Sequence, residues 1–264
     1  MQDDHEVRLV REGALAVIAL GGGLDNYWTL PALTAFSDHL TDLNRTGDCR
    51  CLIVTGGVIA EDSAAFCRGL APSLMADGDV LTGASLNRLF AASYTALRRF
   101  PGVTIAAVNG PAVNEGVALA LNCDFRLATV NASFQFTAGS SGLLPFGGST
   151  QLLPRLVGES WAKRLMLFEH AISAAQAEAI GLVDEVCQID RVEQQARQWS
   201  ASVLKQSPKA MRATKQLIEH ARMRPLETGF AAEREWAAQL IDAGDYREAR
   251  QAQLEIREPN WSDL

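Results

Sequence analysis

Residues 103–128 contain a strand-like run, a tight turn and the start of a predicted helix, a combination that can bind an anion. An apolar run, residues 103–108, ends at the turn Asn109-Gly110-Pro111, and a short apolar helix is predicted from Gly116 to position 121. The first N–H groups of a helix lack intrahelical acceptors, and the helix dipole adds positive potential there. Such an end binds phosphate or stabilises an oxyanion, and this stretch alone leaves both open.

Other reactive side chains are sparse. The four histidines lie at scattered positions without metal-binding spacing: His5, His39, His170 and His220. We therefore expect no metal site. Ser140 and Ser141 lie in a glycine-rich stretch and could orient a water, but no histidine is placed to activate them as nucleophiles. Cys67 is expected to be a small packed residue.

The elements that position this chemistry alternate between strands and helices up to about residue 190, which predicts α/β crossover units. Strands are expected at 7–20 (a hairpin), 51–55, 103–108, 125–128, 133–136 and 183–186. Helices are expected at 29–43, 83–100, 149–156, 160–168 and 173–180, and then at 191–205, 208–222, 226–242 and 246–256. Residues 71–82 are irregular and are expected to form a mobile loop.

Composition narrows the class of protein. The chain has 264 residues, is 48% hydrophobic and has a formal net charge of −7, so it can bury a large core and is a poor partner for nucleic acid or anionic membranes. The N-terminus has no signal-peptide pattern, and no apolar run is long enough to span a membrane. Five cysteines without framework spacing fit a reduced protein. We expect a cytoplasmic location.

Six segments in register resemble the crotonase (enoyl-CoA hydratase/isomerase) superfamily. They are CLIVTGG with AFCRGL, VTIAAVNGPAVNEGVALALNCDFRLA, ASFQF, GLLPFGGSTQLLPRLVG, AISAAQAEAIGLVDEV and the terminal PNW. The resemblance covers nearly the whole chain. It implies a spiral of ββα repeats at 1–195 and a C-terminal helical region at 196–264 used in assembly as a homotrimer or a dimer of trimers.

The resemblance also implies an acyl-CoA substrate, with coenzyme A as part of that substrate and no bound cofactor. Backbone N–H groups of Leu70 and Glu115 would form an oxyanion hole for a thioester enolate. The substrate would lie against eight further residues: Arg68, Ala71, Pro72, Met75, Asn114, Ala118, Ala138 and Phe146.

The chain departs from the family where acid and base are expected. The usual glutamate positions of hydratases match Ala118 and Ala138, and a carboxylate position of some isomerases matches Phe146. None of these side chains can transfer a proton. Glu115 replaces a usually small residue and is the remaining candidate base, although a solvent-facing or inter-subunit carboxylate is the alternative. Tyr94 is expected to be a core or interface residue.

The departures leave several functions open. An enzyme of the hydratase/isomerase type comes first. A divergent relative doing hydrolysis, decarboxylation or isomerisation through a non-standard residue comes next, followed by a non-catalytic acyl-CoA binder. The family's basic residue before the first helix is missing from GGGLDNYWTL, and Arg68 could compensate for it. That loss also keeps an acyl-carrier protein open as the partner that presents the acyl group.

Overall fold

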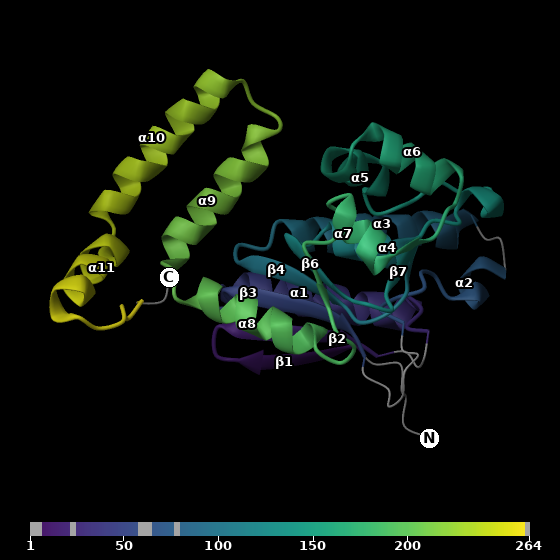
Figure 1. Ribbon diagram of the computed structural model, residues 1–264, viewed down its shortest axis with the longest axis horizontal. Coiled ribbons are helices and arrows are strands. Elements are labelled where there is room, and N and C mark those ends of the chain that lie inside the picture. The colour runs from purple at the N-terminus through teal and green to yellow at the C-terminus, as the bar shows by residue number, and fades with distance from the viewer. Residues whose placement is uncertain (1–6, 22–24, 58–64, 77–79, 262–264) are drawn as a thin grey trace.

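A six-stranded sheet forms the centre of the computed structural model, which describes residues 7–21, 25–57, 65–76 and 80–261 (Figure 1). The strand order is β1 (Arg8–Glu12), β2 (Leu15–Leu20), β3 (Cys51–Gly56), β4 (Val103–Val108), β6 (Phe125–Thr129) and β9 (Glu185–Cys187). Strands β1 and β2 pair as an antiparallel hairpin, and every later neighbour is parallel. Parallel neighbours need crossover connections, and the chain supplies these as helices.

The strands β2, β3 and β4 at the centre of the sheet are buried on both faces, which explains why their sequences are almost continuously apolar. Along β3, Leu52 and Val54 belong to one core cluster, whereas Cys51 and Ile53 belong to the other. Helices α1 (Leu30–Thr46) and α3 (Val80–Arg98) pack on each other and contribute to the first cluster. Helix α8 (Val192–Leu204) packs against β3, β4 and β6 and belongs to the second cluster.

A second, three-stranded sheet lies beside the site described below. It consists of β5 (Ala112–Val113), β7 (Ser133–Gln135) and β8 (Ile172–Ser173). Between these strands and the main sheet lies the short helix α4 (Glu115–Leu121), whose seven residues are all buried. Helices α5 (Ser149–Val157), α6 (Glu159–Leu167) and α7 (Ala174–Ala179) complete this side, with the 3-10 turn η1 (Gly139–Ser141).

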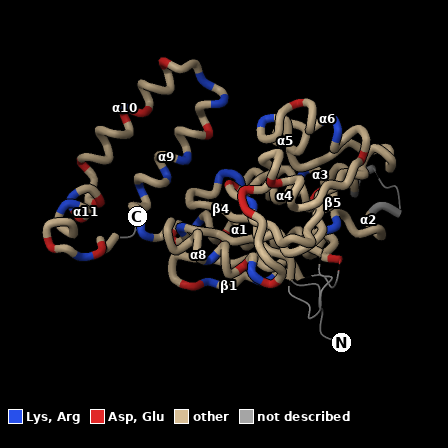
Figure 2. The backbone as a smooth tube through the Cα atoms, in the orientation of Figure 1, with Lys and Arg blue, Asp and Glu red and all other residues tan. Residues whose placement is uncertain are grey.

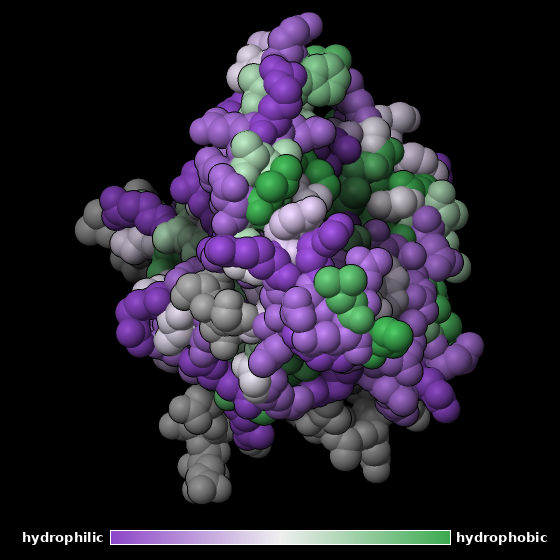
Figure 3. All heavy atoms as spheres, turned by 90° about the vertical axis from the view of Figure 1, so that its left-hand side faces the viewer, coloured by the Kyte–Doolittle hydropathy of each residue, from purple (hydrophilic) through white to green (hydrophobic). Residues whose placement is uncertain are grey.

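The C-terminal helices leave this body. Helices α9 (Pro208–Ala221), α10 (Leu226–Asp242) and α11 (Gly244–Glu255) project to one side in Figure 1, and Figure 2 shows both acidic and basic residues along them. No residue of α10 is buried, and the exposed apolar side chains there include Leu226, Phe230 and Ile241. Figure 3, which faces this side of the molecule, shows hydrophobic patches among hydrophilic ones.

The expected α/β arrangement with C-terminal helices is confirmed by these elements. The irregular segment differs from expectation, because Pro72–Ala76 forms helix α2 and α3 begins at Val80; residues 77–79 lie outside the described part. The predicted strand at 183–186 begins two residues later and ends one residue later, at Glu185–Cys187. The expected domain boundary at 195/196 falls inside α8, and that division stays a prediction.

Candidate active site

The turn that carries Leu70 is held by main-chain bonds to Trp28. The Trp28 N–H donates to the Gly69 carbonyl at 2.7 Å, and the Ala71 N–H donates to the Trp28 carbonyl at 2.9 Å. Because consecutive N–H groups of an extended chain point to opposite sides, Leu70 directs its own N–H away from Trp28. That N–H donates to Glu115 Oε2 at 3.1 Å.

Gly69 is required by this geometry. Its φ of +91° is unfavourable for a residue with a side chain. A Cβ built at this position would lie 2.7 Å from Glu115 Oε2 and 3.3 Å from the Val113 carbonyl oxygen. The turn therefore lies in direct contact with the Glu115 carboxyl group.

Asn114 is the residue directly before α4, and its backbone conformation is unusual, with φ +46° and ψ −105°. Three hydrogen bonds hold it there. The Asn114 N–H donates to the Gln135 carbonyl at 3.0 Å, its side-chain amide donates to Thr137 Oγ1 at 2.9 Å, and its side-chain oxygen accepts from the Thr137 N–H at 2.8 Å. Backbone strain of this kind persists only where surrounding contacts enforce it. The contacts of Asn114 thus fix where Glu115 begins α4.

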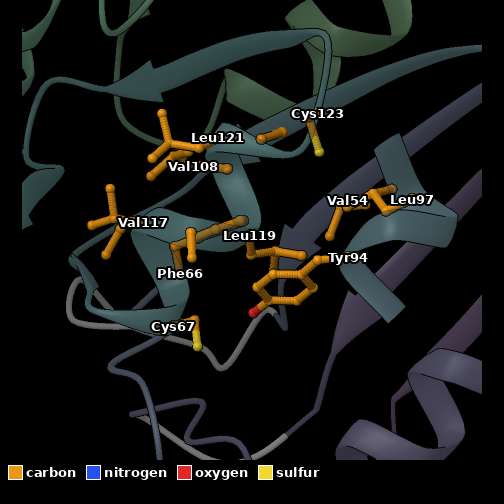
Figure 4. Close-up of a cluster of buried hydrophobic side chains, with 14 of the residues drawn as sticks. Val54, Phe66, Cys67, Tyr94, Leu97, Val108, Val117, Leu119, Leu121 and Cys123 are labelled. Carbon is orange, nitrogen blue, oxygen red and sulfur yellow. The ribbon is translucent and has the colours of Figure 1, made fainter. Parts of the chain in front are cut away.

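Helix α4 lies unusually close to the Leu70 turn. A Cβ on Gly116 would come within 2.1 Å of the Cys67 carbonyl oxygen, so only glycine permits this contact. From the other side, Tyr94 Oη donates to the Glu115 carbonyl at 2.8 Å. Figure 4 shows Tyr94 reaching in from α3, with its hydroxyl turned towards the side on which Cys67 lies. The two segments that carry Leu70 and Glu115 are thereby clamped together.

Glu115 is 5% exposed, and burial raises the pKa of its carboxyl group above the usual value. Hydrogen bonds from the backbone N–H groups of Glu115 itself and of Leu70 act in the opposite direction. These are the two N–H groups that the sequence resemblance pairs as an oxyanion hole. In the structure both act on one carboxyl group.

A cavity of about 540 Å³ opens beside this carboxyl group. Its lining residues are Tyr27, Arg68, Leu70, Pro72, Val113, Asn114, Glu115, Gln135, Thr137, Ala138, Ser141, Leu143 and Phe146. Glu115 is the sole carboxylate among these lining residues. Arg68 forms an ion pair with Asp25, with 2.8 Å between Nε and Oδ1, and both side chains are partly exposed.

The expected substrate residues fall into three groups. Arg68, Pro72, Asn114, Ala138 and Phe146 line the cavity. Ala71 and Ala118 are buried and do not line it, and a Cβ on Gly147 would lie 2.9 Å from that of Ala118. The side chain of Met75 lies outside the described residues.

Glu169 is a site residue that the sequence did not single out. Its carboxylate accepts a hydrogen bond from the Ser140 N–H at 2.7 Å and another from the Ser140 hydroxyl. Its carbonyl accepts from the Gln135 side chain at 3.0 Å. The Ser140 hydrogen bonds lower the pKa of Glu169. Glu169 therefore anchors η1, whose Ser141 lines the cavity, although it lies 29 residues away along the chain.

Other reactive groups are inactive or scattered. All five cysteines are buried and free, and burial raises the pKa of Cys67 to about 12, so it stays a thiol. Within the described ranges, no group of three or more His, Cys, Asp or Glu side chains could hold a metal ion. None of the helices in the described part of the chain combines the length and the hydropathy of a membrane-spanning segment.

Comparison with known proteins identifies the family. The family described as "Enoyl-CoA hydratase/isomerase" matches residues 13–264. A 2,3-dehydroadipyl-CoA hydratase of Escherichia coli (strain K12) is 34% identical over 77% of this chain and 79% of its own length. A 1,2-epoxyphenylacetyl-CoA isomerase of the same organism is 30% identical over 86% of each chain.

Solved structures agree with these matches. The Pseudomonas aeruginosa protein DspI superposes with a TM-score of 0.91 and 38% identity, over 99% of this chain and 98% of that one. An enoyl-CoA hydratase from Bacillus anthracis gives a TM-score of 0.91 and 28% identity, over 98% of this chain and 100% of that one. The chain belongs to the enoyl-CoA hydratase/isomerase family and has the crotonase fold.

Proposed function

We propose that the protein is an acyl-CoA thioester enzyme of the enoyl-CoA hydratase/isomerase type, with the N–H groups of Leu70 and Glu115 as its oxyanion hole. The observation that carries this proposal is the pairing of both N–H groups with one oxygen-bearing group at the edge of a cavity. A thioester carbonyl oxygen in the same position would receive both hydrogen bonds. Its developing negative charge would then be stabilised without reorganisation of the backbone.

The Glu115 carboxylate is the proposed proton-transfer group. In the simplest step, the bond between Cα of the acyl group and its hydrogen breaks and the proton passes to a Glu115 carboxylate oxygen. The electron pair of that bond forms the enolate, whose oxygen lies between the two N–H donors. When the enolate is conjugated with a carbon–carbon double bond, delivery of the proton to the far carbon, Cγ, shifts that double bond and completes an isomerisation. Burial supports this role, because a raised pKa brings a carboxylate closer to the strength of a useful base.

A second candidate function is acyl-CoA binding without turnover. It is favoured by one observation: the cavity wall carries Ala138 and Phe146, and the core carries Ala118, at the positions where proton-transfer groups are expected. The cavity in this reading serves only to bind the acyl group. Arg68 faces the same cavity and is the candidate contact for the polar part of the ligand, whether coenzyme A or a carrier protein presents it.

Turnover of crotonyl-CoA and longer 2-enoyl-CoAs tests the proposal through loss of the conjugated-thioester absorbance. Activity that falls at least a hundredfold in Glu115→Gln, with binding retained, would support an enzyme in which Glu115 moves the proton. Activity that is unchanged in Glu115→Gln would reject Glu115 as that group. Acyl-CoA binding by calorimetry without any turnover would favour the binder, and absence of CoA binding would favour a carrier-protein ligand.

The exposed apolar residues of α10 support contact with another subunit, which we propose to be part of a homotrimer or of a dimer of trimers. Leu226, Phe230 and Ile241 are more than half exposed in the single chain. Large apolar surfaces of this kind favour burial against another subunit.

A further inference from the structure

The Glu115 carboxylate already occupies the position that the proposed function assigns to the substrate oxygen. Glu115 Oε2 lies 3.1 Å from the Leu70 nitrogen, and the Glu115 N–H also acts on this carboxyl group. A hydrogen bond from a neutral donor to a carboxylate is stronger than one to a neutral carbonyl oxygen. The side chain is thus a good ligand for its own oxyanion hole.

The carboxylate and a thioester oxygen exclude each other. The position of a Cβ on Gly69 lies only 2.7 Å from Glu115 Oε2, so the carboxyl group is packed directly against the turn. A second oxygen could not reach the Leu70 N–H while Oε2 remains there. The adjacent cavity of about 540 Å³ provides space into which the side chain could rotate.

We propose that Glu115 is a specificity-determining residue that acts as an internal competitor: a ligand carbonyl enters the oxyanion hole only by displacing the Glu115 carboxyl group. This inference rests on the proposed function, since it takes the hole to be a thioester site. It adds that the hole is closed at rest and that the ease of opening depends on the charge of one side chain.

Among the ionisable groups around the proposed oxyanion hole, Glu115 is the one whose charge is expected to change as the pH falls. The ionisable groups that face it are Cys67 on the turn, Tyr94 on α3 and Arg68 at the cavity wall. Burial raises the pKa of Cys67 to about 12 and that of Tyr94 well above its usual value, so both stay neutral below pH 9. Arg68 pairs with Asp25. A fall in pH therefore neutralises Glu115 first and weakens its hydrogen bonds to the hole.

Two probes isolate the carbonyl contact: butyryl-CoA, and S-butyl-CoA, which is a thioether without the carbonyl. Calorimetry would measure both with the wild type, Glu115→Ala, Glu115→Gln and the exposed charge control Glu159→Gln. In the wild type at pH 8, the two probes should bind within about threefold of each other. In Glu115→Ala, butyryl-CoA should be preferred by about tenfold, as expected for one or two new hydrogen bonds.

The pH series gives a second readout that does not require Glu115→Ala to fold. Between pH 8 and pH 5, the preference of the wild type and of Glu159→Gln for butyryl-CoA should rise severalfold. In the isosteric Glu115→Gln it should stay constant, because the amide does not titrate. A carbonyl preference that is the same in all four proteins and at both pH values would overturn the inference while leaving the proposed function standing. If neither probe binds to any variant, the proposed function itself fails.

Discussion

Tyr94 and Glu115 are joined by a hydrogen bond from the phenol of the first to the main-chain carbonyl of the second, 2.8 Å long and fully buried. The bond ties α3 to the first residue of α4 and so fixes a backbone N–H that we assign to the oxyanion hole. A side chain that looked like an ordinary core residue in the sequence therefore positions the site through the backbone of another.

Tyr94→Phe should lower the free energy of unfolding by about 1–2 kcal/mol, because a buried hydrogen bond is lost without a change in shape. Urea denaturation followed by circular dichroism measures this. Tyr246→Phe is the matched control, since Tyr246 is exposed and should show no change. Equal stability of both variants would mean that the Tyr94 hydroxyl is dispensable.

Gly69→Ala should destabilise the fold by about 1–3 kcal/mol, because φ is +91° and the new methyl group would collide with the Glu115 carboxylate. Gly83→Ala, in the exposed part of α3 with open space around it, should instead be neutral or stabilising by up to about 1 kcal/mol. Thermal and urea melts of the pair test the assignment. Adding Glu115→Ala to Gly69→Ala should recover part of the loss, and no recovery would contradict the contact.

The stability of the protein should depend on pH through Glu115. Its pKa is raised in the folded state by burial, so the folded state retains this proton at pH values where the unfolded chain has lost it. The free energy of unfolding therefore falls as pH rises from the unfolded value to the folded one. Glu115→Gln cannot lose this proton. The free energy of unfolding of Glu115→Gln minus that of the wild type should therefore increase from pH 4.5 to pH 8. A constant difference across that range would exclude a raised pKa.

Lys215 fastens α9 to the core. Its Nζ donates to the Gly102 carbonyl at 2.8 Å and pairs with Asp124 Oδ2 at 2.7 Å. Lys215→Met leaves Asp124 without its cation and should cost about 1–3 kcal/mol, with faster amide exchange in α9 and α10. Lys163→Met removes an exposed pair with Glu159 and should change stability by less than about 0.5 kcal/mol. Unchanged exchange in α9 would show that apolar contacts alone hold the helix.

Self-association should depend on the apolar surface of α10. Phe230→Asp places a charge among exposed apolar side chains and should shift the sedimentation profile towards the monomer. Thr228→Asp adds the same charge on the same helix at an exposed position and should leave the profile unchanged. A monomeric wild type at micromolar concentration would remove the basis for the assembly.

Sequence reasoning succeeded where one residue pattern had one physical solution. The expected strand at 51–55 lies in β3, which is buried along its whole length. The expected helix at 173–180 corresponds to α7, and its start is fixed by the Ser173 hydroxyl, which accepts a hydrogen bond from the Gln176 N–H. It was less successful with β5 and β8, whose two residues each are too short to show a period, and with Pro72–Ala76.

The direction of the Glu115 side chain could not be predicted from the sequence. It depends on the positive φ of Asn114, which is enforced by Thr137, 23 residues later. Glu169 anchors η1 through Ser140, and these two residues are 29 positions apart in the sequence. Contacts between residues so far apart in the sequence are set by the tertiary structure, and no local sequence pattern predicts them.

The residues that hold the backbone at the start of α4 are not the residues that form the rest of the cavity wall. Asn114 and Thr137 hold the start of α4, where the Glu115 N–H that we propose for the oxyanion hole lies, whereas Ala138 and Phe146 lie elsewhere on the cavity wall. Exchanging either wall residue for an acid would add a titratable group without touching the donors. With the oxyanion hole that we propose, a single substitution on the wall would change which proton transfers the cavity supports and would leave the backbone donors in place.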